Sequence, residues 1–190
     1  MLKKIVFLDR DGVINVYPGD GEYILKKEEL KIFPFVKDAL RKLKQAGFLL
    51  YIISNQACVS KGLITSEQLL DLTSYMLNLI EDSSPLIDGV YYCVHQEGDN
   101  CPFRKPSPGL IREVLKKLEI PETEVNNHLL FFIGDSLIDI KCAKTLGIRN
   151  ILVLSGKENL ENKPAWDTQP DYIFSNLEEA VNFILTQEAP

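Results

Sequence analysis

Runs of apolar residues alternate along the chain with segments in which apolar residues recur every three or four positions. The runs are almost continuously apolar, which is typical of strands that are buried on both faces of a sheet. The segments between them have the periodicity of amphipathic helices. The pattern predicts strands at 5–8, 48–54, 89–94, 129–134 and 150–154, a weaker strand at 172–174, and helices at 35–47, 65–82, 107–120, 139–147 and 176–185.

Several of the predicted helices carry end signals. Thr65 and Gln68 have the spacing of a capping box at the start of the second helix. Ser107 is expected to cap the third helix, with Pro108 at its first helical position. Gly47 fits the C-terminal end of the first helix. These signals support the boundaries that the apolar pattern suggests.

The regular alternation of strand and helix predicts an α/β fold with a parallel, doubly wound, Rossmann-like sheet. The chain has 190 residues and contains no internal repeat, linker or low-complexity segment. We therefore expect a single domain over residues 1–190. In such a sheet, ligands bind beyond the carboxyl ends of the strands.

Carboxylates and hydrogen-bond donors follow several of the predicted strands. Asp9, Asp11 and Asp135 would repel one another at one edge of the sheet unless a cation lay between them. Hard oxygen ligands around an open site suit Mg²⁺, which also accepts a phosphate oxygen. Each residue alone could equally be a turn residue or a surface charge. The donors that could hold a phosphate there are Ser54, Asn55 and Lys105.

Charge and composition narrow the class of ligand. The chain has 27 acidic and 21 basic residues and a net charge of -6, which argues against a general nucleic-acid or membrane-surface binder. No apolar stretch approaches the roughly 20 residues that span a bilayer, and no signal peptide is evident. Four cysteines are too few for a disulfide scaffold. We expect a cytoplasmic monomer or weak dimer that takes a small phosphorylated molecule, without a nucleic-acid or membrane partner.

Four short motifs, "DRDGVIN", "SNQ", "RKP" and "GDSLID", occur in the order and spacing of the haloacid dehalogenase (HAD) superfamily of phosphotransferases, which the chain resembles over most of its length. The stretches "SNQACVSKG", "YYCVH" and "ILVLSGK" are similar to D-glycero-D-manno-heptose 1,7-bisphosphate phosphatases and the related histidinol-phosphate phosphatases. The resemblance implies a HAD-like phosphatase. Only about twenty residues separate the first motif from the first predicted helix, which is too few for a helical cap domain.

The resemblance also implies catalytic roles. Asp9 would attack phosphorus and form an aspartyl-phosphate, and Asp11 would act as general acid and base. Mg²⁺ would be held by the Asp9 carboxylate, the Asp11 main-chain carbonyl and Asp135. Asp139 would support the metal shell or a neighbouring lysine. The remaining implied roles are phosphoryl stabilisation by Ser54 and Lys105, and substrate binding by Asn55, Arg104, Asp20 and Tyr23.

A possible zinc site lies in "YYCVHQEGDNCPFRKP". The related phosphatases hold a structural Zn²⁺ here through Cys-x-His and Cys-x-Cys. This chain has Cys93, His95 and Cys101, but Phe103 stands at the fourth position and cannot ligate. Structural zinc sites almost always have four ligands. The alternatives are Zn²⁺ on three ligands completed by water or a nearby carboxylate, and a loop with free thiols and a packed Phe103.

The leading functional hypothesis is removal of the 7-phosphate of heptose 1,7-bisphosphate in lipopolysaccharide heptose biosynthesis. Histidinol phosphate is the alternative substrate, because the first motif is shared by both groups. Two other hypotheses are a catalytically silent HAD domain used for binding and a phosphatase of nucleic-acid ends. One departure bears on specificity, since the heptose phosphatases usually carry lysine where this chain has Ser136.

Overall fold

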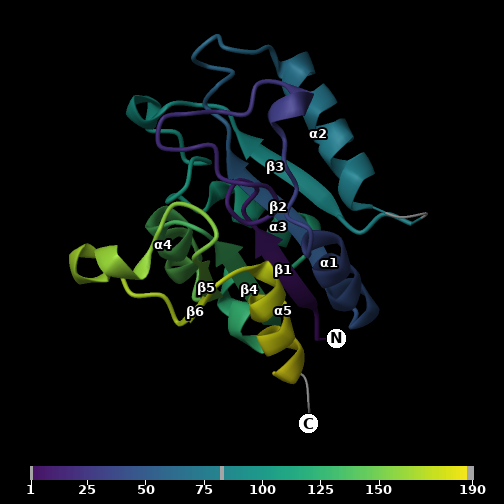
Figure 1. The fold of residues 1–190 in the computed structure, drawn as a ribbon. Coiled ribbons are helices and arrows are strands. Elements are labelled where there is room, and N and C mark those ends of the chain that lie inside the picture. Colours follow the sequence, from purple (N-terminus) through teal and green to yellow (C-terminus); the bar gives the residue numbers. More distant parts are fainter. Residues whose placement is uncertain (1, 82–83, 188–190) are drawn as a thin grey trace.

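The computed structural model describes residues 2–81 and 84–187, and within these ranges strands and helices alternate along the chain (Figure 1). The strands form one sheet in which every neighbouring pair is parallel. The predicted α/β class and doubly wound sheet are therefore confirmed. The strands are β1 (Lys4–Leu8), β2 (Leu49–Asn55), β3 (Gly89–Cys93), β4 (Leu129–Gly134), β5 (Arg149–Val153) and β6 (Tyr172–Phe174).

The strand order β3-β2-β1-β4-β5-β6 places β1 in the middle of the sheet. The chain moves outward from β1 to β3, returns to the other side of β1, and continues from β4 to β6. Such a reversal is the switch point at which doubly wound sheets bind ligands. Leu8 is in register with Ile133 of β4, and the backbone N–H of Asp9 donates to the Ile133 carbonyl at 2.9 Å. The segments that follow β1 and β4 therefore leave the sheet at the same level.

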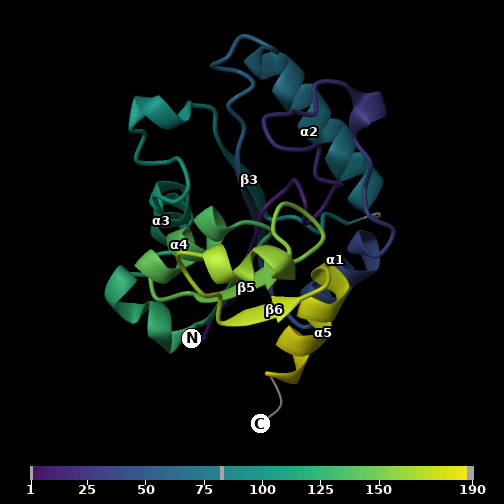
Figure 2. The ribbon, with the colours of Figure 1, turned by 60° about the vertical axis from the view of Figure 1, so that its left-hand side comes forward.

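Helices cover both faces of the sheet (Figure 2). Because side chains alternate along a strand, β1 contributes to two cores. The helices are α1 (Val36–Gln45), α2 (Ser66–Ile80), α3 (Gly109–Lys117), α4 (Leu137–Thr145) and α5 (Leu177–Thr186). Val6 and Leu8 pack in the core with α1, α2 and α5, whereas Ile5 and Phe7 pack in the core with α3 and α4.

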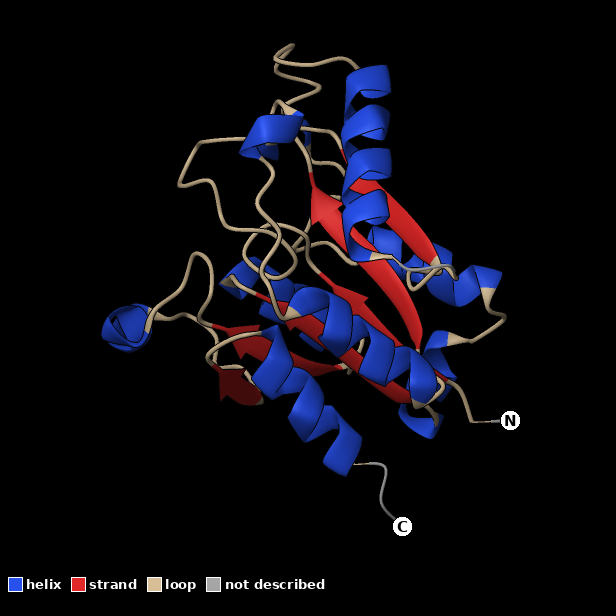
Figure 3. Cartoon of the chain, turned by 45° about the vertical axis from the view of Figure 1, so that its right-hand side comes forward, coloured by secondary structure: helices blue, strands red, loops and turns tan. Residues whose placement is uncertain are grey.

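The loops beyond the carboxyl ends of the strands, drawn in tan, contain only short helices (Figure 3). Between β1 and α1 there is one 3-10 helix, and α2 is the only helix in the described residues between β2 and β3. No cap domain is present in the described ranges. No helix there has the length and apolar character needed to cross a bilayer. The 3-10 helices are η1 (Lys27–Glu29), η2 (Glu97–Asp99), η3 (Glu122–Asn127) and η4 (Leu160–Ala165).

The helix ends agree with the sequence at the end of α1 and the start of α2, and differ at others. Gly47 follows Ala46, the C-cap of α1, with a φ of +84°, as predicted. Thr65 and Gln68 form the predicted capping box of α2, with bonds of 3.2 and 2.8 Å. The predicted 65–82 helix ends at Ile80, and its last position lies outside the described residues. The prediction for α3 was wrong by one residue, because the helix begins after Pro108 and has no side-chain cap. The N–H of Ser107 instead donates to the Arg104 carbonyl at 2.8 Å and closes a turn.

Candidate active site

A cavity of about 260 Å³ lies at the carboxyl edge of the sheet, above the ends of β1, β2 and β4. The 17–23 loop forms one of its walls. Two residues predicted for the site do not line it, since Asp139 lies beneath the cavity floor and Arg104 lines a neighbouring depression. The predicted residues that do line the cavity are Asp9, Asp11, Asp20, Tyr23, Ser54, Asn55, Lys105 and Asp135.

Lys105 contacts several polar groups at the floor of the cavity. Its ammonium forms ion pairs with Asp9 Oδ1 at 2.9 Å and Asp139 Oδ1 at 2.7 Å, and it donates a hydrogen bond to the carbonyl of Ile53 at 2.9 Å. The side chain is almost fully buried. Burial favours the neutral amine, but the charges of Asp139 and Asp9 outweigh it and raise the pKa of Lys105. Lys105 is therefore a fixed positive charge beside Asp9.

Asp139 fixes the position of that lysine. It lies on the first turn of α4, fully buried, and its Oδ2 accepts from the Ser136 hydroxyl at 2.6 Å and the Ser136 N–H at 3.2 Å. This cap starts α4 at Leu137, two residues before the predicted start. A Cβ at Gly134 would lie 2.3 Å from the Asp139 Cβ, so the close approach of the two segments requires glycine there.

Asp135 fits between two glycines. Its Oδ2 accepts the backbone N–H of Lys157 at 2.8 Å. A Cβ at Gly12, which has a φ of +80°, would lie 2.2 Å from Asp135 Oδ2, and a Cβ at Gly156 would lie 2.1 Å from it. The glycine after the second aspartate of "DRDG" therefore makes room for the third aspartate as well as for the turn.

The cavity floor carries more negative than positive charge. Burial raises the pKa of Asp9 to about 6, although Lys105 opposes the shift. Burial, with the charges of Asp9 and Asp139, also raises the pKa of Asp135. Carboxylate oxygens of Asp9, Asp135 and Asp139 lie within 4.8 Å of one another. Among the described residues, two buried cations, Arg10 and Lys105, face the four carboxylates Asp9, Asp11, Asp135 and Asp139. A divalent cation would balance the remaining two negative charges.

Three residues that the sequence did not mark as functional hold Asp11. Arg10 donates to both Asp11 oxygens at 3.0 Å, Asn15 donates to Oδ1 at 2.8 Å, and Gln56 donates to Oδ2 at 3.0 Å. Arg10 is buried and lies over the ring of Tyr92. The sequence signal that could have identified Arg10 is its position just after a buried strand. An arginine that is buried there requires an acidic partner.

The two polar residues at the end of β2 make different contacts. Ser54 accepts a hydrogen bond from Gln56 at 3.2 Å. The Asn55 amide donates to the carbonyl of Lys105 and accepts its N–H, both at 3.1 Å. Asn55 therefore fixes the backbone of the lysine, and a role for it in substrate binding stays a prediction.

The 17–23 loop and Arg104 flank the cavity. Asp20 accepts from the Tyr17 hydroxyl at 2.7 Å and pairs with Lys157 at 2.9 Å. The Lys61 ammonium lies 5.0 Å from the centre of the Tyr23 ring. Arg104 donates to the His95 carbonyl at 3.0 Å and lines the neighbouring depression of about 490 Å³. Asp20, Tyr23 and Asn55 therefore line the cavity, Arg104 lines the adjoining depression, and their roles in substrate binding stay predictions.

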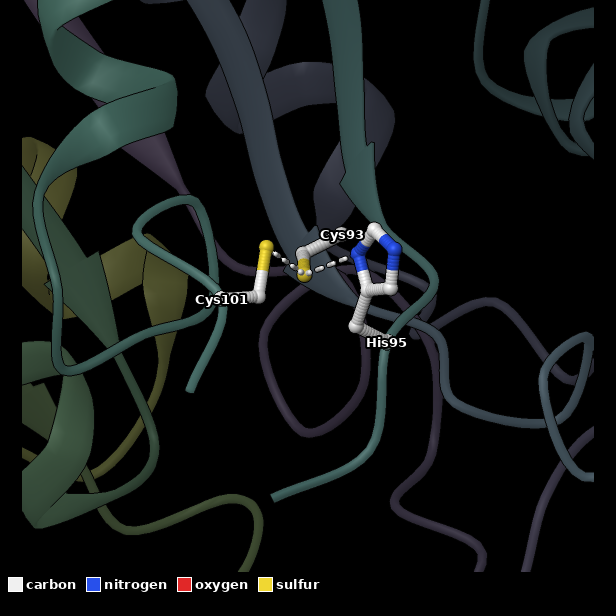
Figure 4. A group of neighbouring side chains, drawn as sticks. All are labelled: Cys93, His95 and Cys101. Carbon is white, nitrogen blue, oxygen red and sulfur yellow. Dashed lines mark hydrogen bonds between the residues drawn. The ribbon is translucent and has the colours of Figure 1, made fainter. Parts of the chain in front are cut away.

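The three candidate zinc ligands also come together (Figure 4). Cys93 lies between the other two, with its Sγ 3.9 Å from His95 Nδ1 and 3.7 Å from Cys101 Sγ. Burial raises the pKa of the Cys93 thiol. Phe103 is 39% exposed and offers no ligand atom. These side chains supply three of the four ligands that structural zinc sites almost always have, so zinc binding here stays a prediction.

We expect Gly156→Ala to lower kcat/KM by about a hundredfold or more, because the new methyl group displaces Asp135. Gly98→Ala is the matched control, since a Cβ there meets nothing within 4 Å and neither glycine has a positive φ. The measurement is hydrolysis of an aryl phosphate by both variants at saturating Mg²⁺. Equal activity of the two variants would show that the space beside Asp135 is not needed.

The raised pKa of Asp9 predicts an unusual pH dependence for the metal-free protein. The pKa rises from 3.8 to about 6, so the folded state binds more protons than the unfolded state between these values. The contribution of Asp9 to stability is therefore full below the unfolded pKa of 3.8 and is lost as the pH rises through 6. Relative to Asp9→Asn, the wild type should lose up to about 3 kcal/mol between about pH 3 and about pH 7 in EDTA. Urea unfolding of both proteins measures this difference, and a constant difference would contradict it.

Comparisons with known proteins agree with this geometry. The HAD-hydrolase-like family model matches residues 102–180. The D-glycero-D-manno-heptose-1,7-bisphosphate 7-phosphatase of Chlorobaculum tepidum is 33% identical over 192 residues, which cover 97% of this chain and 96% of that protein. The D-glycero-beta-D-manno-heptose-1,7-bisphosphate 7-phosphatase of Pasteurella multocida is 32% identical and covers 96% and 97%. The crystal structure of D,D-heptose 1.7-bisphosphate phosphatase from B. bronchiseptica, complexed with magnesium and phosphate, superposes with a TM-score of 0.84 at 26% identity and covers 98% and 99%.

Proposed function

Since the chain belongs to the D-glycero-D-manno-heptose-1,7-bisphosphate 7-phosphatase family of HAD phosphatases, we propose that it removes the 7-phosphate of that sugar. The similarity covers nearly the whole of both chains, so it includes the catalytic edge as well as the scaffold. The observation that carries the proposal is the fixed pair of Lys105 and Asp9, 2.9 Å apart, beside an excess of carboxylate charge. This arrangement suits transfer of an anionic phosphoryl group to a carboxylate.

Asp9 and Asp11 have different roles in the proposed reaction. An Asp9 oxygen attacks phosphorus, the bond from phosphorus to the sugar oxygen breaks, and the Asp11 carboxyl gives its proton to that oxygen. Asp11 then takes a proton from water, whose oxygen attacks the aspartyl-phosphate and releases inorganic phosphate and the Asp9 carboxylate. Lys105 is proposed to stabilise the negative charge on the phosphoryl oxygens, as is the hydroxyl of Ser54. Both residues line the cavity that holds Asp9 and Asp11.

Magnesium fits the charge and the ligands of this edge. The carboxylates of Asp9 and Asp135 and the main-chain carbonyl of Asp11 are hard oxygen donors, and the cavity floor has two negative charges in excess. When bound, Mg²⁺ neutralises charge on the phosphoryl oxygens. Asp139 is proposed to act beneath this shell, because its carboxylate is engaged by Lys105 and Ser136.

The proposal is tested by ranking kcat/KM over a panel of phosphorylated metabolites with Mg²⁺ and with EDTA. The panel includes both anomers of heptose 1,7-bisphosphate, histidinol phosphate and a phosphorylated nucleic-acid end. We expect a heptose bisphosphate to rank first and EDTA to abolish turnover. If histidinol phosphate ranked first, it would replace heptose bisphosphate as the proposed substrate. If no compound of the panel were hydrolysed, the result would indicate a catalytically silent binding domain.

We expect the purified protein to hold less than about 0.1 zinc per chain, because Phe103 removes the fourth ligand. Cys101→Ser should then shift the melting temperature by less than about 2 °C, which is the size of an ordinary surface change. Elemental analysis and thermal unfolding measure these two quantities. Zinc near one equivalent, lost in Cys101→Ser, would show that three side chains are enough.

A further inference from the structure

Lys157 lies where the catalytic cavity meets a second depression. The second depression has a volume of about 490 Å³ and is also lined by Arg104. Lys157, Lys105 and Ile138 line both spaces. A substrate that places one phosphate over Asp9 and extends through this junction would therefore bring its other end beside Lys157.

The backbone of Lys157 is anchored to the catalytic edge. Its N–H donates to Asp135 Oδ2 at 2.8 Å, and the next residue, Glu158, donates its N–H to the Asp135 carbonyl at 3.1 Å. The Ser155 hydroxyl donates to the Gly12 carbonyl at 2.6 Å. The base of the Lys157 side chain is thus held in a defined place relative to the reacting phosphate.

Within residues 2–81 and 84–187, the Lys157 ammonium has one ion pair, which is exposed and joins it to Asp20 of the 17–23 loop at 2.9 Å. The two side chains are 47% and 77% exposed, and such pairs contribute little because solvent screens them. The hydrogen bond to Asp20 raises the pKa of Lys157, so the lysine is charged at neutral pH. Lys105, in contrast, is almost fully buried and is paired with two carboxylates on the cavity floor.

We propose that Lys157 leaves Asp20 and binds the second, non-transferred phosphate of the substrate, which makes it a specificity-determining residue for bisphosphates. The inference rests on the proposed function and deepens it, because it assigns the group that recognises the 1-phosphate. A phosphate dianion offers several acceptors and two charges, whereas Asp20 offers one charge in a solvated pair. Asp20 is then the counter-ion of the empty site, and its release frees the 17–23 loop from Lys157.

The test uses two pairs of substrates that differ by one phosphate: heptose 1,7-bisphosphate with heptose 7-phosphate, and fructose 1,6-bisphosphate with fructose 6-phosphate. The quantity is the ratio of kcat/KM for the bisphosphate to that for the monophosphate. We expect Lys157→Met to lower this ratio at least about tenfold, mainly through the KM of the bisphosphate. Lys157→Arg, which keeps the charge, should retain the ratio within about threefold.

Two further variants separate substrate recognition from support of the loop. Lys141→Met is the matched control, because Lys141 forms an exposed pair with Asp167 and lines neither space. It should leave the ratio unchanged. Asp20→Asn should lower the KM of the bisphosphate about two- to fivefold, because it removes the competing charge. Asp20→Asn and Lys157→Met could instead lower kcat/KM equally for the bisphosphate and the matching monophosphate. In that case the ion pair supports the 17–23 loop and the proposal is wrong.

The outcomes distinguish this inference from the proposed function. A wild type that hydrolyses neither heptose contradicts the proposed substrate, while the fructose pair still decides the role of Lys157. A wild-type ratio near one for both pairs, or a ratio that Lys157→Met leaves unchanged, overturns the role of Lys157 and leaves the phosphatase assignment in place. Absence of any hydrolysis overturns both.

Discussion

Asp9→Asn should lower kcat/KM for the bisphosphate by at least about 10⁴-fold while the protein stays folded. The amide keeps the size of the side chain, but it is a poor nucleophile and forms no aspartyl-phosphate. The substitution also removes one of the mutually repelling carboxylates, so the metal-free fold should gain stability at pH 7. Steady-state kinetics with Mg²⁺ and urea unfolding in EDTA measure the two effects.

Asp167→Asn is the control for this substitution, because Asp167 is an exposed aspartate outside the cavity. It should leave both activity and stability within ordinary surface effects. If Asp9→Asn retained more than about a hundredth of the wild-type kcat/KM, Asp9 would not be the nucleophile. A folded, inactive variant is the outcome that supports the assignment.

Lys105→Met should unfold most easily of the variants considered and should lack measurable activity. The lysine is buried and neutralises Asp9 and Asp139, at 2.9 and 2.7 Å. Removal of one partner of such a cluster leaves uncompensated buried charge, and the cost is about 3 to 5 kcal/mol in EDTA. Urea unfolding measures the stability, and phosphate release from an aryl phosphate measures the activity.

A double variant shows whether the cost of Lys105→Met comes from charge. Lys105→Met combined with Asp139→Asn removes one positive and one negative group, so it should recover part of the stability that the single variant loses. Lys141→Met, at an exposed pair, should cost less than about 1 kcal/mol. Additive losses in the double variant would show that packing, and not charge, makes Lys105 important.

The sequence was sufficient to place Asp9, Asp11, Ser54, Lys105 and Asp135 around one cavity. The physical reason is that parallel strands share a carboxyl edge, so residues far apart in the chain meet once the strands and their direction are known. The near-continuous apolar runs defined those strands because both faces of the sheet are covered. The positions and direction of the strands can therefore be predicted without knowing how the side chains pack.

What the sequence left out depends on packing. Gln56 reaches Asp11 across 45 residues of sequence, and the Asn55 amide bonds the backbone of Lys105 across 50. The contact between Gly156 and Asp135 depends on how closely two loops approach. No periodicity or spacing encodes these distances. The early start of α4 has the same origin, since Asp139 serves at once as a helix cap and as a partner of Lys105.

Phosphorus NMR of heptose 1,7-bisphosphate incubated with the protein observes the reaction directly. With Mg²⁺, we expect one equivalent of inorganic phosphate and one of heptose 1-phosphate, and no change in EDTA. Asp9→Asn should leave the substrate intact under the same conditions. Loss of the 1-phosphate with retention of the 7-phosphate, or an unchanged bisphosphate in the presence of Mg²⁺, would contradict the assignment of this chain as a 7-phosphatase.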